Sequence, residues 1–139
     1  MEPLDLTAQP PRGPRLQLDG LTMLPRTIDK FRASLPGGNL NGYRIAGSSR
    51  RLLEWLGVDE AAMQQAVAGA KTDDDVARWL REHADASAYP AFNERMERRT
   101  ADDVADKTAL NATYPWLAQS ELKKIFDILE EDDRRTYRA

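Results

Sequence analysis

The polar side chains best suited to chemistry are concentrated in one segment, residues 26–51. Arg26, Asp29 and Lys30 follow an i, i+3, i+4 spacing, which puts them on one face of an expected helix. A carboxylate beside an amine can transfer protons, and a neighbouring guanidinium can hold an anion. An enzyme that needs no cofactor could therefore use Asp29 as general acid or base, with Lys30 or Tyr43 as its partner.

The same segment has the features of an anion-binding site. A loop rich in glycine and asparagine, which carries Asn39 and Tyr43, leads into an expected helix N-terminus. Free backbone N–H groups at such an end favour a negatively charged ligand, and hydroxyl and guanidinium groups add to the effect. The candidate ligand-binding residues are therefore Arg26, Asp29, Lys30, Asn39, Tyr43, Ser48, Ser49 and Arg50.

Each of these residues also has a purely structural explanation. Asp29 can pair with Arg26 or another neighbour, the two serines can cap the helix, and Arg50 can remain in solvent. Three functions therefore stay open, and none of them fixes whether the protein is an enzyme. They are a small binding module with its site on the 26–51 face, a cofactor-independent enzyme, and a structural protein–protein interaction domain without a pocket.

The composition excludes several classes of site. The chain has no cysteine and one histidine, which rules out thiolate zinc sites, iron–sulfur clusters, disulfides and multi-histidine metal sites. The glycines of residues 37–42 are not followed by the Lys-Ser/Thr pair of a P-loop, and the Rossmann glycine motif is missing. We therefore expect no metal and no cofactor.

Charge and hydropathy limit the partners. The net charge of −3 argues against a nucleic-acid partner. Residues 1–57 carry eight Lys/Arg against five Asp/Glu, a positive balance that would steer an anion towards this part of the chain. No run of about 18 apolar residues exists that could enter a membrane. We expect a soluble, cytoplasmic protein whose partner is a small anionic ligand or another protein.

Hydrophobic spacing predicts an all-α fold in a single domain over residues 1–139. Four prolines within the first 14 residues predict an extended arm over residues 1–18, held by Leu4, Leu6, Leu16 and Leu18. Residues 19–139 form the expected helical body, with about six or seven short helices. The expected helices cover residues 24–35, 48–57, 59–70, 72–83, 87–99, 100–112 and 120–129.

Four local features are also expected. Residues 72–75 have the pattern of a helix-capping box. Residues 43–45 form a short strand-like piece, and the acidic residues 130–133 fray because they oppose the helix dipole. The three tryptophans contribute to the core rather than to a ligand site: Trp55, Trp79 and Trp116.

Short motifs spread along the chain carry a family resemblance. They are MLPRTIDK at residues 23–30, LPGGN at 35–39, Tyr43, SRRLLE at 49–54 and LGV at 56–58. With the motifs at residues 5–12 and 126–129, they resemble a family of small bacterial proteins catalogued only as a domain of unknown function. The resemblance spans most of the chain and is weak over residues 98–120. It implies a bacterial cytosolic protein, and it brings with it neither an activity nor catalytic residues.

Overall fold

Helices account for most of the regular structure in the computed structural model, which describes residues 1–137. Seven α-helices, together with short 3₁₀ helices, make 58% of the chain helical, and this confirms the predicted all-α domain. The elements in order are β1 (Gln17–Leu18), β2 (Leu21–Thr22), α1 (Leu24–Ala33), α2 (Ser48–Leu56), α3 (Glu60–Gly69), α4 (Asp73–His83), η1 (Ala86–Ala88), α5 (Tyr89–Arg98), η2 (Ala101–Asp103), α6 (Lys107–Thr113), η3 (Pro115–Gln119) and α7 (Ile125–Thr136).

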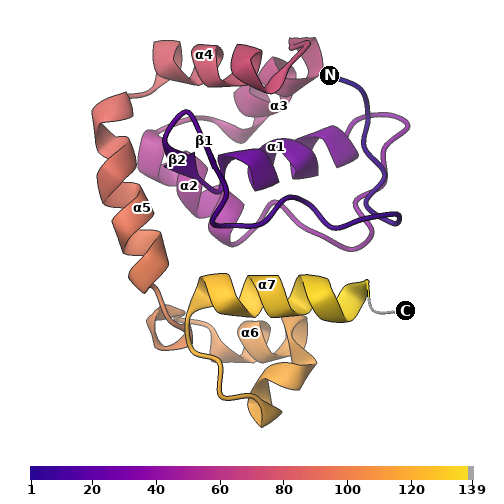
Figure 1. Ribbon diagram of the computed structural model, residues 1–139, viewed down its shortest axis with the longest axis vertical. Helices are drawn as coiled ribbons and strands as arrows, with labels where there is room; N and C mark the ends of the chain where they lie inside the picture. The colour runs from indigo at the N-terminus through magenta and orange to yellow at the C-terminus, as the bar shows by residue number, and fades with distance from the viewer. Residues whose placement is uncertain (138–139) are drawn as a thin grey trace.

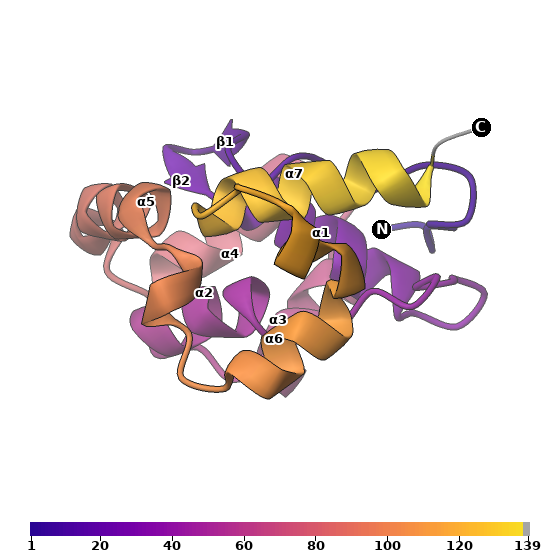
Figure 2. The same cartoon turned by 90° about the horizontal axis from the view of Figure 1, so that it is seen from below.

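The elements form an upper group and a lower layer (Figure 1). Helix α1 lies at the centre of the upper group, where it contacts α2, α3 and β1. Helix α5 runs along one side and connects this group to α6, η3 and α7, which form the lower layer (Figures 1 and 2). Within residues 1–137, no helix is both long enough and apolar enough to cross a bilayer.

Nearly every residue of helix α1 is buried. Its apolar residues Leu24, Ile28 and Phe31 belong to the core, at the spacing that the sequence predicts. Pro25 occupies the first turn, where its missing N–H costs nothing. The polar residues between them are buried too, and Arg32 alone in this helix keeps partial exposure. A polar side chain that is removed from water must find a hydrogen-bond or ion-pair partner in the protein, or else face a cavity.

Glycines set both ends of α2. Gly47 precedes the helix with φ 90°, and Gly57 ends it with φ 69°, conformations that glycine adopts without strain. The expected serine caps are wrong, because no side chain caps this helix. Ser49 is fully buried instead, and its hydroxyl lies 3.0 Å from that of Thr27.

The N-terminal arm packs closely against the body. Asp5 forms an isolated parallel bridge with Asn39, and Leu6 is fully buried. Arg12 contacts both Asp29 of α1 and Asp73 of α4. One expected anchor is wrong: the side chain of Leu16 is half exposed, so it does not hold the arm against the body.

Several predicted boundaries in the second half are wrong. The expected helix over residues 100–112 is split into η2 and α6. Thr100 and Asp103 form a capping box, but the turn that follows it is a short 3₁₀ helix, and Asp106 caps a separate helix after it. The last helix begins at Ile125 rather than at residue 120, since Thr100 and Lys124 form an isolated bridge. The predicted helix-capping box at residues 72–75 is confirmed at the start of α4.

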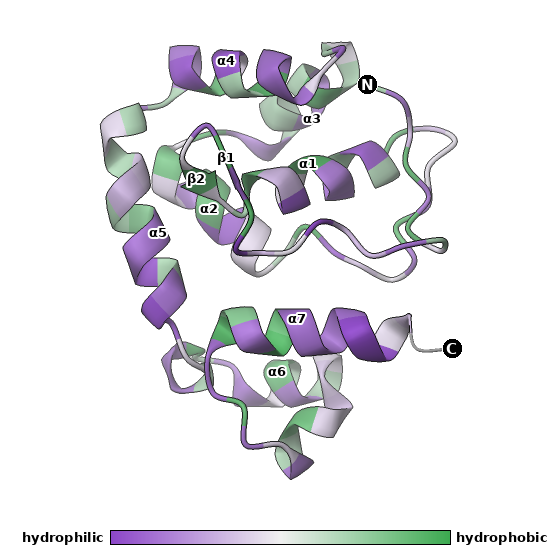
Figure 3. Ribbon diagram, viewed as in Figure 1, coloured by the Kyte–Doolittle hydropathy of each residue, from purple (hydrophilic) through white to green (hydrophobic). Residues whose placement is uncertain are grey.

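Three other local expectations need correction. Residues 43–45 form no strand. The acidic residues near the end of α7, a hydrophilic stretch in Figure 3, stay helical because Glu131 pairs with Arg134 and Arg135 and because Asp133 is buried. Trp55 is 38% exposed, since its indole N–H bonds the carbonyl of Ala88 at the surface.

Candidate functional site

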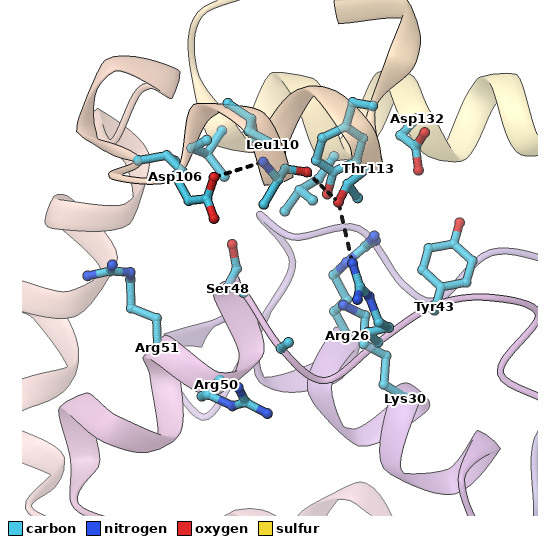
Figure 4. A pocket seen from close by; sticks show the side chains of 18 of the residues that line it. Arg26, Lys30, Tyr43, Ser48, Arg50, Arg51, Asp106, Leu110, Thr113 and Asp132 are labelled. Atoms are coloured by element: carbon cyan, nitrogen blue, oxygen red, sulfur yellow. Dashed lines mark hydrogen bonds between the residues drawn. The ribbon is translucent and has the colours of Figure 1, made fainter.

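A cavity of about 650 Å³ lies where the upper group meets the lower layer. One wall comes from α1, the loop after it and the start of α2, and the other comes from α6 and α7. Figure 4 shows the two walls facing each other, with Arg26, Tyr43 and Ser48 on one side and Asp106, Leu110 and Thr113 on the other. We refer to this cavity as the pocket.

Cations outnumber acids in the pocket lining. Six basic side chains border it: Arg26, Lys30, Arg44, Arg50, Arg51 and Arg99. Three acidic side chains do so: Glu54, Asp106 and Asp132. Helix α2 also begins at the pocket, at Gly47 and Ser48, so its dipole adds positive potential there.

The Arg26 guanidinium is already neutralised. Arg26 is 1% exposed and forms two hydrogen bonds to the carboxylate of Asp133, at 2.7 and 3.0 Å. The Tyr43 hydroxyl donates to the same carboxylate at 2.7 Å. Burial and this hydrogen bond raise the pKa of Tyr43, which keeps the phenol protonated. Asp133 therefore fixes Arg26 and Tyr43, which both line the pocket, in place.

Lys30 lies one turn after Arg26 on the same helix and differs from it in having no partner. Its side chain is buried, with 5% exposed, and it forms neither a hydrogen bond nor an ion pair within residues 1–137. Its Nζ lies 5.9 Å from the centre of the Tyr43 ring. Burial, together with the charge of Arg26, lowers the pKa of Lys30 to about 7. An amine with this pKa is about half neutral near pH 7.

The arginines near the start of α2 are compensated only weakly. Arg50 lies 4.0 Å from Glu60, and both side chains are about half exposed. Arg51 and Arg99 form no ion pair with any residue that the structure describes. Burial, and next the charge of Arg51, lower the pKa of Arg99. This mutual repulsion would be relieved by an anion bound between them.

The structure brings five of the eight predicted site residues together. The five that line the pocket are Arg26, Lys30, Tyr43, Ser48 and Arg50. Asp29 does not line it, because its buried carboxylate accepts from the backbone N–H of Arg12 at 2.8 Å and from the Arg12 guanidinium. Asn39 lies at the bridge with Asp5, and Ser49 bonds Thr27. These three have structural roles.

Four residues in the pocket or directly beside it lie outside the predicted set. Arg51 could have been included, since it directly follows Arg50 at the same helix start. Arg99, Asp132 and Asp133 come from distant parts of the chain, and no local pattern marks them as neighbours of the 26–51 segment. Burial raises the pKa of Asp132, whose carboxylate accepts from the Trp116 indole at 3.2 Å.

Within residues 1–137, no three His, Cys, Asp or Glu side chains lie close enough together to hold a metal ion.

Comparison with known proteins identifies a family but no function. A protein-family model matches residues 8–135, and the family is described as a domain of unknown function. No curated protein matches the chain.

Proposed function

The chain belongs to this family, DUF5069, and we propose that the protein binds a small anionic ligand in the pocket between α2 and α6. The observation that carries this proposal is the placement of Arg51 and Arg99 together on the pocket lining, neither of them in an ion pair with a residue between 1 and 137. Lys30 adds a third uncompensated group deeper in the pocket. An anion would stabilise all three, and a guanidinium can hold a carboxylate or phosphate through two hydrogen bonds.

The size of the pocket fits a metabolite rather than a macromolecule. A volume of about 650 Å³ is typical of small-molecule sites. The apolar residues Leu110, Ile125 and Leu129 on the α6–α7 side would contact the carbon skeleton of such a ligand. This argument favours a binding module over an interaction domain without a pocket.

The alternative enzyme, with Asp29 as general acid or base, has less support. A catalytic acid or base must reach the substrate. The Asp29 carboxylate is held by Arg12, which also pairs with Asp73 at 2.6 Å. Any chemistry in the pocket would have to use another group.

A ligand screen tests the proposal. Thermal denaturation would be followed with sulfate, phosphate, pyrophosphate, citrate and a set of phosphorylated and carboxylated metabolites, and titration calorimetry would give the affinity of each hit. We expect a hit to stabilise the wild type and to stabilise Arg51→Ala and Arg99→Ala much less.

The matched control is Arg98→Ala. Arg98 precedes Arg99, is exposed, and pairs with Glu94 at 3.5 Å outside the pocket. The variant loses the same charge, so it should keep the affinity of the wild type. Equal binding by wild type, Arg51→Ala and Arg99→Ala would contradict the proposal.

We also propose a cytoplasmic location, which agrees with a chain that lacks cysteine. Cell fractionation with an antibody against the protein would test it, and recovery with the envelope or the medium would contradict it.

A further inference from the structure

Lys30 can add its charge to the proposed anion site, but that site does not require a buried amine. Arginines are sufficient to hold an anion, and a buried lysine without a partner carries a cost that a structural role would not require. Met or Leu could fill the same volume without that cost. The position of Lys30 therefore calls for a function of the amine itself.

Lys30 is unlike the other lysines of the chain. Lys71, Lys107, Lys123 and Lys124 are all exposed, whereas Lys30 is buried on α1 and borders the pocket. Lys107 donates to two backbone carbonyls and Lys124 lies 3.5 Å from Glu97. Lys30 has no such partner among residues 1–137, so its Nζ is available to a molecule in the pocket.

The surroundings keep a large fraction of this amine neutral. Arg26, next to it on α1, repels a second positive charge, and burial disfavours the ammonium form. Asp133 would favour the ammonium, but its carboxylate is already bound by Arg26 and Tyr43. A lysine that is desolvated beside another cation has the environment of an amine nucleophile.

The groups at the two ends of the pocket are suited to a ligand that has an anionic group at one end and a carbonyl group at the other. Figure 4 shows Arg51 and Asp106 at one end and Tyr43, Lys30 and Asp132 at the other. An anionic group held near Arg51 and Arg99 would leave the rest of a short ligand directed towards Lys30. A carbonyl group at that position would meet the amine.

We propose that Lys30 forms an imine with an aldehyde or ketone that carries a carboxylate or phosphate group. This inference rests on the proposed anion site for the binding of the charged group. The Nζ lone pair bonds to the carbonyl carbon, and the carbonyl oxygen leaves with the two amine hydrogens as one molecule of water. The step changes no oxidation state, so it needs neither an oxidant nor a reductant.

Reductive trapping tests this chemistry in the whole protein. Succinic semialdehyde, whose carboxylate and aldehyde lie at opposite ends of a four-carbon chain, would be added with cyanoborohydride near pH 7, and peptide mass spectrometry would give the labelling rate of each lysine. We expect Lys30 to react at least about tenfold faster than the exposed Lys71, because about half of the Lys30 amine is neutral at this pH and the pocket holds the charged probe beside it. The comparison is made within one molecule, so it needs no folded variant.

Four controls identify the cause of the reactivity. The Lys30 rate should reach half its maximum near pH 7. Sulfate should slow the reaction at Lys30 and leave Lys71 unchanged. Acetaldehyde, which has no charge, should lose the preference for Lys30. Lys30→Met should remove this label while its thermal unfolding stays cooperative.

The possible outcomes separate the two proposals. Labelling of Lys30 no faster than that of Lys71, in a protein that still binds sulfate through Arg51, would overturn the imine and leave the anion site intact. Fast labelling that neither sulfate nor Arg51→Ala changes would overturn both, because the carbonyl compound would not be held by its charge. Absence of both sulfate binding and fast labelling would also overturn both.

Discussion

Arg26 and Asp133 form a buried, bidentate ion pair that joins the first helix of the chain to the last. The two N–O distances are 2.7 and 3.0 Å, and 107 residues separate the partners. The pair fixes α7 against α1 and so holds the two walls of the pocket together. Since Tyr43 also donates to Asp133, the loop after α1 is fixed at the same point.

Removal of either partner should strongly destabilise the protein. Arg26→Ala would leave a buried carboxylate without its cation, and Asp133→Ala would leave a buried guanidinium. Each change should lower the free energy of unfolding by about 3–5 kcal/mol. Urea denaturation followed by circular dichroism measures this. Glu94→Ala, which breaks an exposed pair with Arg98, should cost under about 0.5 kcal/mol. A loss below about 1 kcal/mol for both core variants would show that the pair does not hold α7 in place.

The sequence predicts the parts of the fold that depend on local spacing. Leu24, Ile28 and Phe31 identify α1 and its buried face, and the box at residues 72–75 identifies the start of α4. Asp133 shows the limit of this reasoning. The dipole of a helix disfavours an acidic side chain near the helix C-terminus, so local reasoning predicts that Asp133 destabilises this end. In the structure, Asp133 is stabilised by the guanidinium of Arg26, which is distant in sequence.

The candidate site is predicted in part for the same reason. The 26–51 segment forms one wall of the pocket, so its residue types were informative. The other wall comes from α6 and α7, and nothing in their sequence shows that they face α2. The structure places Asp29 outside the pocket because its partner, Arg12, reaches it from the proline-rich arm, where no periodic pattern fixes the position of a side chain.

Arg12 should be required for stability rather than for binding. Its guanidinium pairs with the buried Asp29 and with Asp73, at 3.1 and 2.6 Å. Because Arg12 is itself about one-third exposed, we expect Arg12→Ala to cost about 1–3 kcal/mol. Urea denaturation gives the value, and Arg81→Ala, which breaks the more exposed pair with Asp19, serves as control. An Arg12→Ala variant of normal stability that fails to bind sulfate would instead put Arg12 in the site.

The two adjacent serines should behave differently. Ser49→Ala removes the buried hydrogen-bond partner of Thr27 and should cost about 1 kcal/mol of stability, with no change in anion affinity. Ser48 borders the pocket, and its hydroxyl has no role as a helix cap. Ser48→Ala should therefore change stability little and reduce affinity. Thermal denaturation with and without sulfate separates the effects, and the reverse pattern would contradict the assigned roles.

Lys30 should make stability depend on pH in the alkaline range. Its pKa is about 7 in the folded protein and 10.5 as a free side chain, so the unfolded chain binds more protons between these values. Stability should therefore rise as the pH increases from about 7 to about 10. Below about pH 7 the full cost of the buried ammonium remains.

Lys30→Met isolates this contribution. The methionine carries no charge, so the variant should be more stable than the wild type near pH 7 by a few kcal/mol, and the gap should narrow towards pH 10. Urea denaturation of both proteins at several pH values measures this difference in the free energy of unfolding, and the contributions of other titrating groups cancel in it. A difference that does not change with pH would show that Lys30 keeps an ordinary pKa.

Arg50 and Arg51 are both exposed, but Glu60 lies near Arg50, whereas Arg51 lies near the positive charge of Arg99. A charge-assisted hydrogen bond to an anion is worth about 1.5–3 kcal/mol, and an anion bound at Arg51 would also relieve its repulsion with Arg99. Arg51→Ala should therefore weaken sulfate binding about tenfold. It removes the cation that opposes Arg99, so it should cost little or no stability.

Arg50→Ala should have the smaller effect on binding, because Glu60 already compensates part of the positive charge of Arg50. Calorimetric titration of both variants with sulfate at low salt, where charges are screened least, tests the order. If Arg50→Ala weakened binding more than Arg51→Ala, the anion would lie at the outer rim of the pocket, out of reach of Arg99. If Arg50→Ala mainly unfolded the protein, its pairing with Glu60 would be structural, and Arg50 would have no place in the anion site.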